Sequence, residues 1–166
     1  MRHAWLGVAV VGCVAYACGR VPLSGPPSMR LGRAECAECG MLINEDRCSS
    51  AMLVERGGRR EHLMFDDIGC MLDYEEAHGD AFLVIDRFVH DHGTRAWLGA
   101  PDAVFLVTGA DELFTPMGSG MVAFGDAERA SQALARYGGE LLEFNAIRVW
   151  RREWVERRRS GFQAEQ

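Results

Sequence analysis

The sequence predicts an α+β fold, a duplicated ββαβ module, from two observations. Residues 50–92 and 100–150 each contain two β-rich apolar stretches, then an amphipathic helical pattern, then another apolar stretch. In addition, a shift of 59 residues aligns Phe65, Asp67, Gly79 and Leu83 with Phe124, Asp126, Gly138 and Leu142. We therefore expect one domain over residues 34–150, with halves of about 34–92 and 100–150. The alternative is a chance similarity between two generic α+β stretches.

The first half has clear start and stop signals. We expect strands over residues 50–55 and 61–65, joined by Gly57-Gly58, a dipeptide typical of tight hairpins. A helix should begin at the capping acids Asp66 and Asp67 and end at His78-Gly79. A strand over residues 81–89 completes the module.

The second half repeats this order. We expect strands over residues 103–108 and 120–124, a helix over 126–137 and a strand over 141–150. The Arg-rich tail, residues 151–166, is interpreted as a solvated amphipathic end.

The first 33 residues indicate export. Residues 1–17 resemble a lipoprotein signal peptide, because Arg2 precedes an apolar stretch that is too short to span a membrane permanently. The residues that end at Cys18 and those that end at Cys13 each resemble a lipobox, the sequence at which a cysteine is lipidated. Cys18 is the expected lipidation site and Cys13 the alternative, and an ordinary or uncleaved signal is the other interpretation. Residues 18–33 are rich in Pro, Gly and Ser, which is typical of a flexible linker. The expectation is a periplasmic protein that is lipid-anchored to a membrane.

The overall charge argues against one class of partner. The formal net charge is −6, with 24 acids against 18 bases. Such a balance disfavours nucleic acid as the main partner, because binding to phosphates needs an excess of basic residues.

Soft metal ligands gather around one short motif. Cys36-Ala37-Glu38-Cys39 is a C-x-x-C, and in an oxidising compartment its two thiols could instead form a disulfide. Met41 follows almost directly, and thiolate together with thioether suits Cu(I). We therefore interpret Cys36, Cys39 and Met41 as metal ligands.

Three further residues could complete such a site. Met117 stands in a loop-like segment with a proline and glycines, where core packing does not explain a thioether. His90 and His92 alternate on an extended chain, so both imidazoles could face one ligand, with Asp91 orienting one of them. Cys48 and Cys70 are left open between structural thiol and ligand.

Several blocks of residues occur together in one order: Cys36-Ala37-Glu38-Cys39-Gly40-Met41-Leu42-Ile43, Phe88-Val89-His90-Asp91, Trp97 with Ala100-Pro101, Pro116-Met117-Gly118 and Phe124. In this ordered set the sequence resembles the NosL family. The resemblance implies a periplasmic Cu(I) chaperone that feeds the copper-sulfur centre of nitrous oxide reductase. It also implies a duplicated ββαβ fold similar to that of organomercurial lyase, and a partner that is a cuproenzyme or its maturation complex.

The expected function is thus Cu(I) carriage to a cuproenzyme, without catalysis. Two other functions stay open from the residues alone. One is a thiol-disulfide oxidoreductase that uses Cys36 and Cys39, although such enzymes place the motif at the start of a helix. The other is a structural zinc module with four ligands drawn from the cysteines and histidines.

Overall fold

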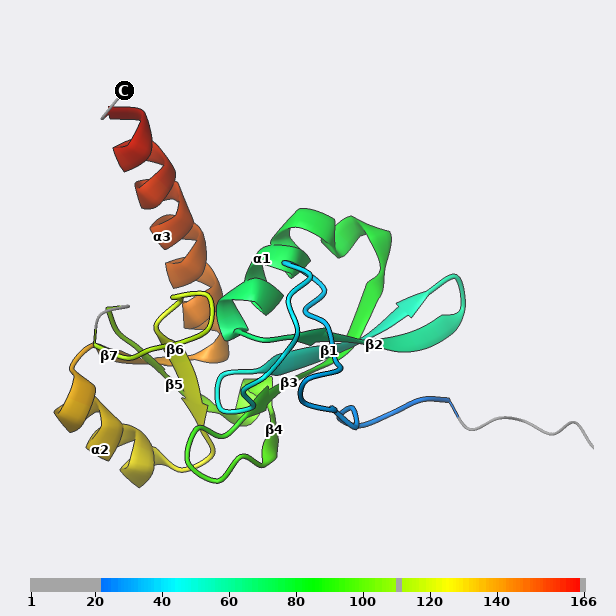
Figure 1. Ribbon diagram of the computed structural model, residues 1–166, viewed down its shortest axis with the longest axis horizontal. Helices are drawn as coiled ribbons and strands as arrows, with labels where there is room; N and C mark the ends of the chain where they lie inside the picture. Colours follow the sequence, from blue (N-terminus) through cyan, green and yellow to red (C-terminus); the bar gives the residue numbers. More distant parts are fainter. Residues whose placement is uncertain (1–21, 110–111, 165–166) are drawn as a thin grey trace, which may run out of the picture.

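The computed structural model describes residues 22–109 and 112–164, with side chains up to Ser160. Within these residues the chain forms two antiparallel sheets and three α-helices (Figure 1). The expected signal peptide, residues 1–17, and the candidate lipidated cysteines Cys18 and Cys13 lie outside the described residues. None of the helices in the described part is both long and apolar enough to cross a membrane.

The first module is a four-stranded sheet with one helix on it. Its strands are β1 (Ser50–Arg56), β2 (Arg59–Phe65), β3 (Leu83–His90) and β4 (Trp97–Gly99), in the order β2-β1-β3-β4. Helix α1 (Ile68–His78) is followed by the short 3-10 turn η1 (Gly79–Ala81), and a second such turn, η2 (Ala100–Asp102), follows β4. Gly57 and Gly58 both have positive φ, so the expected tight hairpin is confirmed.

The second module repeats this topology. It consists of β5 (Val104–Val107), β6 (Met121–Phe124), α2 (Ala127–Tyr137) and β7 (Glu140–Glu143). Its strand order, β6-β5-β7, corresponds to β2-β1-β3 of the first module. The expected offset of 59 residues relates both ends of α1 to those of α2, and Asp67 and Asp126 both act as N-caps. The duplicated ββαβ fold is confirmed.

The strands of the second sheet separate two hydrophobic cores. Phe105 and Val107 of β5 face the main core, which also contains residues of α1 and the first sheet. Leu106, the intervening residue, packs into a smaller core with Ala130 of α2. The second sheet thereby joins the two modules into one unit.

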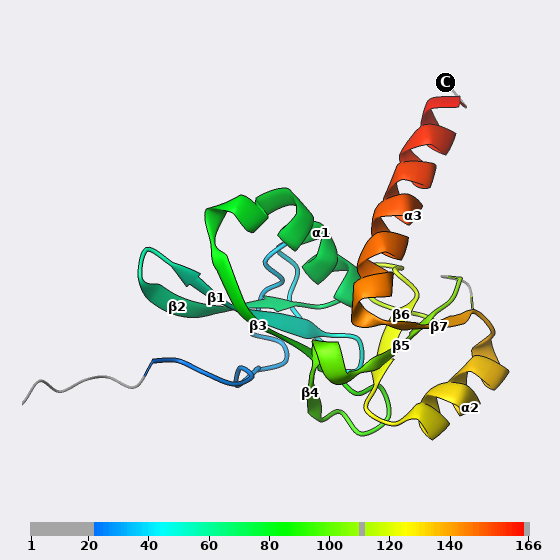
Figure 2. The same ribbon diagram turned by 180° about the vertical axis from the view of Figure 1, so that it is seen from behind.

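The expected strand over residues 141–150 is wrong beyond Glu143. Helix α3 (Phe144–Ala164) begins there and includes the described part of the tail (Figures 1 and 2). Phe144, Ile147 and Arg151 are buried at a spacing of three and four residues, which is helical periodicity. The apolar content of residues 146–150 favoured a strand, but the buried face recurs with the period of a helix. The first turns of α3 pack against α1 and β5, while its end projects from the body.

Ordered contacts begin earlier than residue 34. In the segment 22–33, which we expected to be a free linker, the backbone oxygen of Gly25 lies 2.7 Å from Nε2 of His62 on β2. Met29 packs against the main core, and its sulfur accepts a hydrogen bond from Ser49. The polar composition of this stretch was misleading, because its contacts are made largely by backbone groups and one methionine.

Candidate metal centre

The C-x-x-C motif lies in a short antiparallel loop over residues 35–42. The Cys36 N–H donates to the carbonyl oxygen of Met41 at 2.8 Å, and the Gly40 N–H donates to the carbonyl oxygen of Cys36 at 2.9 Å. Gly40 has a φ of +74°, which a side chain would disfavour. The turn thus holds Cys36 and Cys39 close together.

Backbone contacts place this loop at the beginning of α1. The Ala37 N–H donates to the carbonyl oxygen of Met64 near the end of β2, at 2.8 Å. Asp66 comes directly after β2, and Cys70 lies in the first turn of α1. Figures 1 and 2 both show the loop rising beside α1. Residues distant in sequence are therefore neighbours here.

The result is a cluster of three thiols and one carboxylate. The ligand atoms of Cys36, Cys39, Cys70 and Asp66 all lie within 4.8 Å of one another. The Cys39 thiol donates to the Asp66 carboxylate oxygens at 3.8 and 3.9 Å. Cys36, Cys70 and Asp66 are buried, whereas Cys39 is partly exposed. We call these four residues the thiol cluster.

The three thiols of the thiol cluster differ in pKa. A hydrogen bond from Cys70 lowers the pKa of Cys36 to about 7, against the opposing effect of burial. The same hydrogen bond, with burial, raises the pKa of Cys70. Burial also raises the pKa of Cys39. Near neutral pH, Cys36 is therefore the thiol that most readily becomes a thiolate, the form that binds metals.

The two predicted methionine ligands are exposed, and a backbone hydrogen bond ties Met41 to Cys36 of the thiol cluster and Met117 to Asp67, the neighbour of Asp66. Met41 contacts Cys36 through its backbone, and its residue surface is 46% exposed. The Met117 N–H donates to Oδ2 of Asp67 at 3.1 Å, which docks its loop on the start of α1, and Met117 is 42% exposed. Both residues are accessible to solvent or to a docked molecule.

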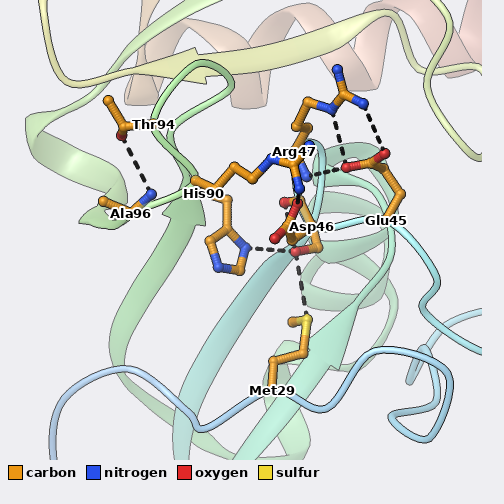
Figure 3. Close-up of polar contacts among 9 residues, drawn as sticks. Met29, Glu45, Asp46, Arg47, His90, Thr94 and Ala96 are labelled. Carbon is orange, nitrogen blue, oxygen red and sulfur yellow. Dashed lines mark hydrogen bonds and ion pairs between the residues drawn. The ribbon is translucent and has the colours of Figure 1, made fainter.

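The predicted histidines are not brought into the thiol cluster. Strand β3 ends at His90, so the alternation expected for an extended chain does not continue to His92. Nδ1 of His90 lies 2.7 Å from the Ser49 hydroxyl, a contact that Figure 3 marks with a dashed line at His90. The His90 ring stacks on Trp97 at a centroid distance of 3.6 Å. His92 packs edge-on against Phe124. Both imidazoles thus have other neighbours.

Asp91 also has a different role from the expected one. Rather than orienting a histidine, its carboxylate accepts from the N–H groups of Gly93, Thr94 and Gly125 and from Arg129. These bonds lower the pKa of Asp91 to about 2 despite its burial. Asp91 fixes the turn after β3 and connects it to the second module.

Sequence reasoning missed Asp66 and left Cys70 open. Asp66 looked like a helix cap, but Asp67 alone accepts the capping hydrogen bond, from the Gly69 N–H. The sequence does indicate that Asp66 and Cys70 lie near each other, because they are four residues apart across the start of a helix. Cys48, by contrast, lies in the smaller core, where burial raises its pKa to about 12. Cys48 is a structural thiol.

Comparisons with known proteins agree with this architecture. The crystal structure of the copper chaperone NosL from Shewanella denitrificans superposes with a TM-score of 0.57 at 22% sequence identity, and the match covers 72% of this chain and 96% of that one. A search of curated proteins finds no match. The family model NosL matches residues 29–150, which is most of the chain. The protein therefore belongs to the NosL family.

Proposed function

We propose that this protein is a chaperone that binds one Cu(I) ion at the thiol cluster and passes it on without catalysis. The observation that carries the proposal is the convergence of Cys36, Cys39 and Cys70, with Asp66, within 4.8 Å. Membership of the NosL family and the fold shared with a copper chaperone support it.

The donor set fits Cu(I). Thiolates are soft ligands and favour Cu(I) over harder ions. Cys36 supplies a thiolate near neutral pH, and a bound cation would displace the protons that Cys39 and Cys70 retain. Copper binding should therefore release protons.

The difference in burial between the thiols suggests a route for release. Cys36 and Cys70 are 2% and 5% exposed, whereas Cys39 lies on the open side of the cluster. A ligand from a docked partner could replace Cys39 first, while the two buried thiols still hold the ion. Met41 and Met117 would offer thioether ligands to the ion as it leaves the thiol cluster.

A structural zinc site is the second candidate, because three thiolates and one carboxylate satisfy a tetrahedral zinc ion. The oxidoreductase alternative is less well supported. The C-x-x-C lies in a loop between antiparallel segments, whereas oxidoreductases of this type place it at a helix start.

The decisive experiment is a competition titration of the reduced full-length chain, in mild detergent, with Cu(I) and the chromophoric chelator bicinchoninate. We expect one Cu(I) per chain and an affinity that falls by at least about tenfold in Cys39→Ser and Cys70→Ser. Cys48→Ala, which removes a thiol from the smaller core, should bind like the unmodified chain. Zinc that withstands an excess of Cu(I) would instead identify a zinc module.

We further propose that the acceptor is a cuproenzyme of the nitrous oxide reductase type and that a lipid on Cys18 holds the protein at the periplasmic face of a membrane. The lipobox-like sequence and the resemblance of the motifs support these assignments. Transfer of copper from the loaded chain to apo nitrous oxide reductase tests the acceptor. Radiolabelled palmitate incorporation that is lost in Cys18→Ala tests the anchor.

A further inference from the structure

A pocket lies between the two modules, and its lining shares no residue with the thiol cluster. It has a volume of about 440 Å³. The second module contributes one face of α2, including Arg129 and Arg136. The first module contributes Arg47 and the turn after β3, which carries His92 and Arg95.

The charged side chains that line this pocket are all basic. Arg47, Arg95, Arg129 and Arg136 line it, and no acidic residue does. This composition is opposite to that of the whole chain, whose net charge is −6. A cluster of guanidinium groups in a concave site attracts anions.

Acidic residues outside the lining hold three of these arginines in place. Glu45 accepts two hydrogen bonds from the Arg47 guanidinium (Figure 3), and Arg129 donates to Asp91 at 2.8 Å. Asp46 forms an ion pair with Arg95 at 3.5 Å. Each guanidinium carries five N–H donors, so these contacts leave donors free.

His92 adds one polar atom without a partner, a nitrogen of its imidazole ring. Its Nδ1 atom is buried and has no hydrogen-bond partner among the residues that the structure describes. A buried nitrogen without a partner is energetically costly unless a ligand or a local adjustment satisfies it.

We propose that this pocket binds an oxyanion of the phosphate class. A carboxylate is satisfied by one guanidinium, which presents two parallel N–H groups to it. Three of the four guanidinium groups already pair with a carboxylate, and the N–H donors that they retain, together with those of Arg136, suit a group with more acceptor oxygens and more charge, as in a phosphate. A free phosphate ester and a lipid headgroup share this chemistry.

The test is isothermal titration calorimetry of the metal-free full-length chain, in mild non-ionic detergent, with inorganic phosphate at constant ionic strength. We expect one saturable site per chain. In the double variant Arg47→Gln/Arg136→Gln the affinity should fall by about tenfold or more. Both arginines are away from the thiol cluster, and neither is buried.

Arg152→Gln/Arg157→Gln on α3 is the matched control, because it removes the same charge from exposed positions. Its affinity should stay within about twofold of the unmodified chain. If the double pocket variant unfolds, the single exposed change Arg136→Glu replaces it, with the same expected loss. Absence of saturable binding, or an equal loss in the α3 control, would overturn the proposal.

A second titration, with the water-soluble lipid dihexanoyl phosphatidylglycerol, identifies the source of the phosphate group. Tighter binding of inorganic phosphate indicates a free phosphate, and tighter binding of the lipid indicates a headgroup. Either result supports the site if the pocket variants bind that ligand more weakly than the unmodified chain does.

Discussion

The Sγ atoms of Cys70 and Cys36 lie within 4.8 Å of each other, although Cys70 belongs to α1 and Cys36 to the loop over residues 35–42. This contact is the main reason why the pKa of Cys36 lies near 7. The protonation of the proposed copper site thus depends on how α1 is placed against the loop that carries Cys36.

Removal of the Cys70 thiol should therefore raise the pKa of Cys36. In Cys70→Ala the thiolate loses its donor while burial continues to disfavour the charge. Thiolate absorbance near 240 nm, followed against pH in reduced metal-free protein, measures the change. We expect a step near pH 7 in the unmodified chain and a step at higher pH in Cys70→Ala. Persistence of the step near pH 7 in Cys36→Ser would refute its assignment.

Replacement of Asp91 should destabilise the contact between the modules. Asp91→Asn loses the charge that four hydrogen bonds stabilise, so the free energy of unfolding should fall by about 2–4 kcal/mol. Urea denaturation measures this. Asp86→Asn, an exposed position on β3, is the control and should change it by less than about 0.5 kcal/mol.

The carboxylate of Asp91 should also make the free energy of unfolding fall at low pH. The folded pKa of Asp91, about 2, lies below that of an unfolded aspartate, so between these values the unfolded chain binds more protons. The contribution of Asp91 is complete above about pH 4 and is lost as the pH falls toward 2. Asp91→Asn should lack this part of the acid destabilisation, and an identical acid profile in the variant would contradict the assignment.

Asp73 should anchor α3 to α1. It receives two hydrogen bonds from the Arg151 guanidinium, at 2.9 and 2.8 Å, and Arg151 is buried. Asp73→Ala leaves that charge without its partner and should cost about 2 kcal/mol in thermal or urea unfolding. Glu153→Ala on the exposed face breaks the ion pair with Arg157 and should cost less than about 0.5 kcal/mol. Equal costs would show that α3 is not held in this way.

Gly120 should be indispensable for the loop that carries Met117. Its φ is +65°, and a Cβ atom there would lie 2.2 Å from the carbonyl oxygen of Thr108. Gly120→Ala should lower the free energy of unfolding by about 2 kcal/mol or more. Gly79→Ala, where φ is −56° and no atom lies within 4 Å of the added Cβ, should be almost neutral. A neutral Gly120→Ala would contradict the described loop.

The fold could be predicted because its signals are local and repeated. Gly57-Gly58 specifies a hairpin, Asp67 and Asp126 specify helix starts, and one offset relates the two modules. The prediction failed at Phe144, where the apolar residues suit a strand or a helix and only contacts with α1 and β5 decide.

The candidate site could be predicted only in part. The C-x-x-C is visible in the sequence, because both thiols lie in one turn. The spacing of Asp66 and Cys70 indicates that these two lie near each other, but their approach to Cys36 depends on the long-range hydrogen bond between Ala37 and Met64, which the sequence does not reveal. The imidazole of His90 suits a metal ligand, but its neighbours Ser49 and Trp97 are set by tertiary packing, which the sequence does not reveal.

X-ray absorption at the copper K-edge of the Cu(I)-loaded full-length chain identifies the atoms that bind the ion. If Cys36, Cys39 and Cys70 hold the ion, the first shell consists mainly of sulfur, and it loses one sulfur in Cys70→Ser. A shell of nitrogen from imidazoles that is unchanged in Cys70→Ser would contradict the thiol cluster as the copper site.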